Sequence, residues 1–276
     1  MKTALLREGI RLAVGTLTIL PTAPPKVVDR RTGSWAMTLA PLAGALLGLI
    51  AGTVLWLLTQ GPFPGGPYVG ISPVLASALT LALVVVLTRA MHLDGLADTA
   101  DGLGSGKPAA AALDVMRRSD IGPFGVVTIV LTLLIQVAAL SQLTAEGMGP
   151  LSVALGLVVS RLILPVVCSR GIAAARPDGL GQVVADSASR GQLFVALLLG
   201  TASIVLFFAL ASALTDVSGM VAGGMVAGAM AALLGLLAGS ALCWWCVRRL
   251  GGVTGDVMGA CVEVTFTAAL VVLAVV

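Results

Sequence analysis

Residues 192–214 read QLFVALLLGTASIVLFFALASAL, an apolar stretch without a charged side chain. As a helix rising 1.5 Å per residue, such a stretch is long enough to cross roughly 30 Å of bilayer hydrocarbon. Apolar stretches of comparable length recur along the chain. We therefore predict an all-α integral membrane protein with about seven transmembrane helices, over 36–59, 71–91, 123–143, 151–168, 192–214, 220–246 and 257–276.

The composition of the whole chain agrees with this fold class. Of its 276 residues, 58% are hydrophobic and 11% are charged, and the mean hydropathy is +1.07. A soluble domain carries about 25% charged residues. No segment between the spans is long enough to bury a core of its own, so we expect 1–276 to form a single polytopic membrane domain.

The N-terminal segment differs from the predicted spans. Three charged side chains interrupt residues 3–20, and Pro21 follows them. We predict an N-terminal interfacial helix here that ends at Pro21, because proline cannot continue a helix and charges disfavour the bilayer interior.

Basic side chains gather on one side of the predicted topology. They occur before the first span and after the second, fourth and sixth, whereas the connections 60–70, 144–150 and 215–219 hold no Lys or Arg. By the positive-inside rule, the N-terminus and the connections 92–122 and 169–191 face the cytoplasm. We expect a bacterial cytoplasmic (inner) membrane protein with catalytic loops on the cytoplasmic side. No basic patch predicts a nucleic-acid partner.

The polar chemistry is densest between residues 89 and 102, which read RAMHLDGLADTADG. Asp94, Asp98 and Asp101 stand at i, i+4 and i+7, so a helix places the three carboxylates on one face. Hard oxygen ligands suit Mg²⁺ or Mn²⁺. We predict these three aspartates as metal ligands and, with the only histidine, His92, as the catalytic residues. The alternative is an acidic helix end at a membrane surface.

Basic residues follow in the same connection. Arg117 and Arg118 lie in MRRSDIGPFG, residues 116–125, and Lys107 lies in GSGKP. The planar guanidinium fork binds phosphate oxygens in pairs, so we predict all three side chains as phosphate ligands. The alternative is an anchor for the next helix under the positive-inside rule.

The second long connection contains AARPDGLGQ, residues 174–182. We predict that Arg176 contacts a phosphate or carboxylate of a substrate. The alternative is an ion pair between Arg176 and Asp178 within a turn that proline and glycine favour.

The last predicted span begins with GGVTGDVMGACVE, residues 251–263. Asp256 and Glu263 are seven residues apart on one helix face, and Glu263 lies roughly 10 Å deeper. An acid at that depth is paired, protonated or beside water. We expect Arg161 of the fourth span to pair with Glu263, in a structural ion pair or as part of a catalytic cavity.

Glycines at small-xxx-small spacing predict close helix packing. The positions are Gly44, Gly48 and Gly52, and again Gly224 and Gly228. Such spacing lets two helix backbones approach each other closely within a membrane.

Four of these stretches together resemble the cobalamin synthase family, the adenosylcobinamide-GDP ribazoletransferases. They are HLDGLADTADG (92–102), MRRSDIG (116–122), ARPDGLG (175–181) and GGVTGDVMGACVE (251–263). The family often shows an acid followed by an arginine in the second of these stretches, whereas here Arg118 precedes Asp120. An ion pair with its two members exchanged would keep the same local geometry.

The resemblance implies the last assembly step of the cobalamin nucleotide loop. A hydroxyl of α-ribazole, or of its 5′-phosphate, attacks the cobinamide-bound phosphorus of adenosylcobinamide-GDP and expels GMP, with Mg²⁺ as cofactor. An aspartate or His92 takes the proton of that hydroxyl. Expected partners are both substrates and membrane lipid, with a homo-oligomer as a further expectation. The substrate-binding residues are then Lys107, Arg117, Arg118, Asp120, Arg176, Asp256 and Glu263.

Two other functions compete with this interpretation. The D-G-x-x-x-x-x-D pattern is similar to that of the CDP-alcohol phosphotransferases, a class of lipid phosphotransferases, although their full signature is absent. Arg161 and Glu263 inside spans would also suit an ion path in a secondary transporter. The crowding of polar groups at one face favours surface chemistry instead.

Overall fold

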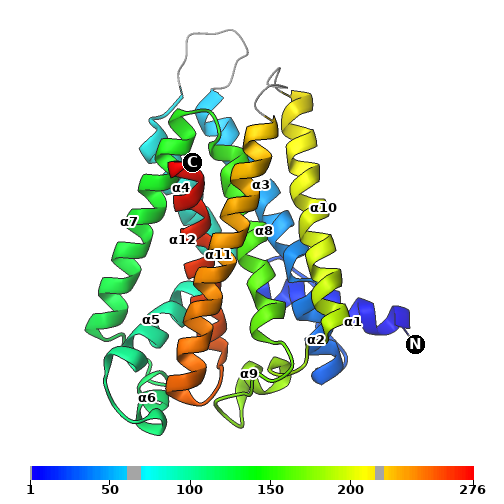
Figure 1. The fold of residues 1–276 in the computed structure, drawn as a ribbon, viewed down its shortest axis with the longest axis vertical. Coiled ribbons are helices and arrows are strands. Elements are labelled where there is room, and N and C mark those ends of the chain that lie inside the picture. Colours follow the sequence, from blue (N-terminus) through cyan, green and yellow to red (C-terminus); the bar gives the residue numbers. More distant parts are fainter. Residues whose placement is uncertain (1, 61–69, 215–220) are drawn as a thin grey trace.

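The computed structural model of the chain describes residues 2–60, 70–214 and 221–276. Long helices run side by side, and shorter ones gather near one end, which we call the loop end; it is the lower end in Figure 1. The described residues form twelve helices: α1 (Lys2–Leu17), α2 (Arg30–Thr38), α3 (Ala40–Gln60), α4 (Pro73–Leu87), α5 (Met91–Gly104), α6 (Ala109–Val115), α7 (Pro123–Ala145), α8 (Gly149–Val167), α9 (Gly179–Val184), α10 (Arg190–Leu214), α11 (Val221–Leu250) and α12 (Gly255–Val275).

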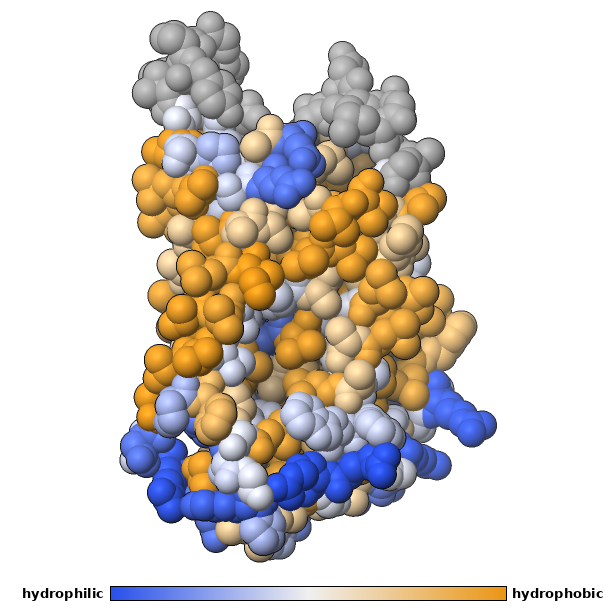
Figure 2. Space-filling view, turned by 60° about the vertical axis from the view of Figure 1, so that its left-hand side comes forward, coloured by the Kyte–Doolittle hydropathy of each residue, from blue (hydrophilic) through white to orange (hydrophobic). Residues whose placement is uncertain are grey.

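Six of these helices are long and apolar enough to cross a membrane, namely α3, α7, α8, α10, α11 and α12. Hydrophobic side chains form a broad belt on the surface, and hydrophilic ones collect at the loop end (Figure 2). The chain is therefore an all-α, multi-pass membrane protein, as predicted. The connections 60–70 and 215–219 fall largely or wholly outside the described residues.

The remaining predicted span, 71–91, corresponds to α4, which ends at a sharp bend into α5. Helices α4 and α5 meet at 88°, because Arg89 and Ala90 both adopt left-handed backbone conformations, with φ of 55° and 56°. Residues with a Cβ rarely adopt this conformation. The bend therefore sets α5, which carries the aspartates, across the direction of α4.

Helix α8 is the centre of the bundle. It is the most buried of the six long helices, and α3 packs along it through the predicted glycine face. A Cβ at Gly48 would lie 2.9 Å from the Cα of Ala154, and one at Gly52 would lie 2.8 Å from the carbonyl oxygen of Pro150. The predicted close packing is confirmed for this helix pair.

Helix α1 is tied to the bend between α4 and α5. Nη2 of Arg89 donates hydrogen bonds to the carbonyl oxygens of Gly15 and Thr16, at 2.6 and 3.2 Å. These bonds satisfy carbonyl groups at the end of α1 that have no partner within the helix. Helix α1 ends at Leu17, earlier than the predicted Pro21, and its last residues reach the site described below.

Helices α5 and α12 approach each other closely at two glycines. A Cβ at Gly95 would lie 2.7 Å from the carbonyl oxygen of Asp256, and one at Gly259 would lie 3.2 Å from the Cα of His92. Because neither glycine carries a side chain, the two backbones nearly touch. This contact brings the stretches 92–102 and 251–263 together.

Candidate active site

A cavity of about 290 Å³ lies where α5, α12, α9 and the end of α1 meet. It is lined by residues from three of the four stretches that carry the family resemblance. Its polar lining includes His92, Asp94, Arg176, Asp178, Thr254 and Asp256. The fold therefore assembles a single polar site from segments that are far apart in the sequence.

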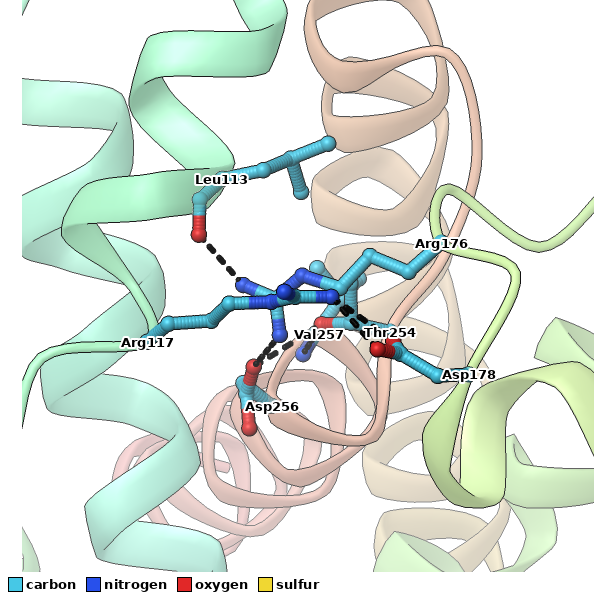
Figure 3. Close-up of polar contacts among 7 residues, drawn as sticks. All are labelled: Leu113, Arg117, Arg176, Asp178, Thr254, Asp256 and Val257. Carbon is cyan, nitrogen blue, oxygen red and sulfur yellow. Dashed lines mark hydrogen bonds and ion pairs between the residues drawn. The ribbon is translucent and has the colours of Figure 1, made fainter.

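Arg176 is held between α6 and α12 (Figure 3). Its Nη1 lies 3.3 Å from Oδ2 of Asp256, and its Nη2 donates to the carbonyl oxygen of Leu113 at 2.6 Å. The hydroxyl of Thr254 donates to the same Oδ2 at 3.2 Å and accepts a hydrogen bond from the backbone N–H of Val257. Thr254 thus caps α12 and positions Asp256, as N-cap threonines do.

Arg117 pairs with Asp178 on the other side of the same region (Figure 3). Its Nη2 lies 2.8 and 2.7 Å from the two carboxylate oxygens. Both side chains are about half exposed, so the pair contributes at most about 1 kcal/mol to stability. The alternative of an ion pair between Arg176 and Asp178 is wrong, because each residue pairs with a different partner.

The three aspartates of α5 share a helix, as predicted, but they meet different surroundings. Asp94 is exposed, Asp98 is half-buried and Asp101 is buried. The carboxylate oxygens of Asp101 accept hydrogen bonds from the backbone N–H groups of Gly122 and Gly125, at 2.7 and 2.9 Å. These groups belong to the first turn of α7, so Asp101 caps that helix from outside it.

The acidic cluster is completed by a residue of another helix. The negative charge of Asp98 is repelled by three other carboxylates, those of Asp94, Asp256 and Asp101. It is attracted by the guanidinium group of Arg176. Across the described ranges, no three His, Cys, Asp or Glu side chains are arranged to hold a metal ion by themselves. Asp94 and Asp256 therefore line the cavity, Asp98 stands one turn along α5 from Asp94, and Asp101 is engaged with α7.

His92 lines the inner part of the cavity. Its side chain is only 2% exposed, and within the described part of the chain neither ring nitrogen has a hydrogen-bond partner. Buried polar atoms are nearly always hydrogen-bonded. Both nitrogens are therefore available to a polar group that enters the cavity.

Three predicted substrate ligands lie apart from the cavity. Lys107, Arg118 and Asp120 are exposed, and none of them lines it. The carbonyl oxygen of Lys107 accepts a hydrogen bond from Arg249 at 2.6 Å. A direct role in binding substrate stays a prediction for these three residues.

Glu263 lies deeper along α12 and has a partner that the sequence did not indicate. Its Oε2 accepts a hydrogen bond from Nε2 of Gln136 at 3.0 Å. Arg161 is fully buried and donates to the hydroxyl of Ser160 at 2.8 Å. The expected ion pair between Arg161 and Glu263 is wrong, because none of the four ion pairs among the described residues joins them.

A cluster around Asp186 holds the second long connection against α2. The backbone N–H of Gly171 donates to Oδ1 of Asp186 and Arg30 binds Oδ2, both at 2.7 Å. The hydrogen bond from Gly171, supported by the charge of Arg30, lowers the pKa of Asp186 below its ordinary value of 3.8. These contacts fix the start and the end of the connection that carries Arg176.

Sequence reasoning missed three polar residues of the cavity lining, namely Thr254, Asp178 and Thr16. Thr254 stands two residues before Asp256 at the start of a predicted helix, and threonine at that position is an N-cap signal. The sequence predicts Asp178 only as a partner of Arg176 within a turn. Thr16 and Leu17 of α1 also line the cavity, and no sequence signal connects them with it.

The fold and the site together define a multi-pass membrane protein whose polar cavity sets carboxylates against an arginine at one end of the bundle. The sequence profile of the family described as Cobalamin-5-phosphate synthase matches residues 9–274, nearly the whole chain. The chain belongs to this family.

Curated relatives agree with the family match. The chain is 36% identical over 275 residues to a protein of Frankia casuarinae, covering 96% of this chain and 93% of the relative. It is 38% identical over 265 residues to a protein of a Nocardioides species, with 96% and 97% covered. Both relatives are named adenosylcobinamide-GDP ribazoletransferase. No solved structure matches the chain significantly.

Proposed function

We propose that this protein is an adenosylcobinamide-GDP ribazoletransferase whose reaction takes place in the cavity between α5 and α12. The observation that carries the proposal is the convergence of 92–102, 175–181 and 251–263 on this cavity, in a chain that matches the family over 9–274. In the reaction, a hydroxyl oxygen of α-ribazole or its 5′-phosphate forms a bond to the cobinamide-bound phosphorus. The bond from that phosphorus to GMP breaks, and the hydroxyl loses its proton.

We further propose Mg²⁺ as the cofactor. The donor set fits this ion, because Mg²⁺ in proteins is commonly held by one or two carboxylates, several waters and substrate phosphates. Asp94 and Asp98 of α5 would hold it, with Asp256 of α12 beside them. Bound there, the ion would neutralise charge on the diphosphate during the displacement.

The protein side chains supply binding, orientation and proton transfer. Arg176 and Arg117 each contact a carboxylate at present, and a substrate phosphate would offer the same guanidinium groups equivalent oxygens. The unpartnered nitrogens of His92 suit a hydrogen bond that orients the attacking hydroxyl. We assign the acceptance of its proton to a carboxylate of the cluster, Asp94 or Asp98.

We also propose that the loop end faces the cytoplasm, at the bacterial inner membrane. Lys and Arg occur in the N-terminal segment and in connections on one side of the predicted topology, apart from Arg161 inside a predicted span and Arg89 near the end of another. By the positive-inside rule, the side of a membrane protein that is richer in Lys and Arg faces the cytoplasm. The cavity would then open toward cytoplasmic nucleotides.

The test is a reconstitution of the purified full chain. We expect adenosylcobinamide-GDP, α-ribazole and Mg²⁺ to yield a complete corrinoid and one GMP per turnover, EDTA to stop the reaction, and Mg²⁺ to restore it. Release of CMP from a CDP-activated lipid would support a lipid phosphotransferase instead. Substrate flux across vesicles without chemistry would support a transporter.

The proposed metal ligands are tested by substitution. We expect Asp94→Ala and Asp98→Ala to lower turnover at least about 100-fold, as is typical when catalytic electrostatics are removed, while the helical content of the protein is unchanged. Asp114→Ala is the matched control, because Asp114 is exposed on α6 and does not line the cavity. Full turnover in the Asp94 and Asp98 variants would exclude the metal role.

A further inference from the structure

Helix α11 carries a repeated aromatic and basic pattern at the loop end. Trp244 and Trp245 are 60% and 53% exposed, and Arg248 and Arg249 each follow one of them by four residues. Residues four apart lie on the same helix face, so each indole stands one turn from an arginine. The guanidinium carbon of Arg248 lies 4.7 Å from the centre of the Trp244 ring.

The length of α11 places this pattern at the edge of the bilayer. Its apolar segment, Gly224–Leu250, has 27 residues and is therefore roughly 40 Å long. This exceeds the roughly 30 Å of hydrocarbon in a bilayer. A helix of this length would put the two indoles at the membrane–water interface, where tryptophan is enriched, and the arginines at the level of the lipid phosphates.

No acidic side chain among the described residues forms an ion pair with Lys107, Arg248 or Arg249. The four ion pairs among the described residues involve other arginines. Nη2 of Arg249 donates instead to the carbonyl oxygen of Lys107 at 2.6 Å, so the backbone of an exposed lysine contacts this arginine. The hydrogen bond also connects α11 with the segment between α5 and α6.

We propose that the α11 surface, defined as Lys107, Trp244, Trp245, Arg248 and Arg249, binds the headgroup of an anionic phospholipid. The guanidinium groups would bind the lipid phosphates, and the indoles would lie along the glycerol and upper acyl region. Exposed indoles that continue an apolar span favour a lipid over a soluble phosphate, which has no apolar part to cover them.

The test compares lipid binding to the purified full chain by native mass spectrometry and in nanodiscs. We expect tighter binding of phosphatidylglycerol than of phosphatidylcholine. The double variant Arg248→Gln, Arg249→Gln should weaken phosphatidylglycerol binding by about 30-fold, because each basic residue near an anionic surface contributes about fivefold. Phosphatidylcholine binding should not change.

The control is Arg170→Gln, which removes an exposed arginine elsewhere in the loop end and should leave lipid binding unchanged. Soluble glycerol phosphate should not compete with the lipid. The proposal is overturned if the protein binds phosphatidylglycerol no more tightly than phosphatidylcholine. It is equally overturned if Arg170→Gln weakens phosphatidylglycerol binding as much as the double variant does. It is also overturned if glycerol phosphate competes at equal concentration. Circular dichroism verifies that the variants keep their helices.

Discussion

Asp101 offers a sharp test of the site, because the sequence predicts a catalytic residue there and the structure shows a helix cap. Its two oxygens accept two backbone N–H bonds, at 2.7 and 2.9 Å. In Asp101→Asn, one oxygen becomes an NH₂ group that faces an N–H donor. One bond to a charged group is therefore lost, and the other becomes a neutral bond.

The size of the effect follows from these contacts. A hydrogen bond to a charged group contributes about 1.5–3 kcal/mol, and a negative charge at a helix N-terminus adds about 0.3–1 kcal/mol. We expect Asp101→Asn to lower the free energy of unfolding by about 2–4 kcal/mol. Asp94→Asn is the matched comparison, because Asp94 is exposed in the first turn of α5. There we expect a loss of only about 0.3–1 kcal/mol.

The assay measures unfolding of both variants in detergent micelles and, separately, their rate of GMP release. Asp101→Asn should unfold much more readily than Asp94→Asn, and Asp94→Asn should lose turnover while losing at most about 1 kcal/mol of stability. Equal stability of the two variants would refute the capping role of Asp101. If Asp101→Asn is stable but has no turnover, the result would support the metal-ligand role that the sequence predicts for Asp101.

Three further predictions follow from individual contacts. Gly48→Ala should lower the free energy of unfolding by about 1–3 kcal/mol by overpacking, because the new Cβ meets Ala154 at 2.9 Å; wild-type stability in micelles would contradict this. Arg117→Ala should change unfolding by at most about 1 kcal/mol and raise the KM for the diphosphate substrate, and an unchanged KM would exclude Arg117 from binding. The lowered pKa of Asp186 means that its charge stabilises the fold above about pH 3.8, and this contribution is lost as pH falls through the folded-state pKa. Asp186→Asn should therefore be less stable than wild type at pH 7 and match it below that pKa, as thermal unfolding at both pH values would check.

The sequence alone was sufficient for the membrane helices, because apolar length is a local property. The predicted spans 123–143 and 192–214 agree with α7 and α10 within two residues at each end. The bend between α4 and α5 was not predictable in the same way. Arg89 and Ala90 adopt a left-handed backbone that neither residue favours, so contacts with the rest of the fold impose it.

For the site, the sequence supplied the residues and the tertiary structure decided their partners. The spacing of Asp94, Asp98 and Asp101 placed them on one helix face, as the i, i+4, i+7 pattern requires. Spacing says nothing about which helix packs against that face. Only packing turned Asp101 toward the first turn of α7 and brought Asp256 of α12 against Gly95, into the cavity that Asp94 lines, because long-range contacts depend on how whole helices fit together.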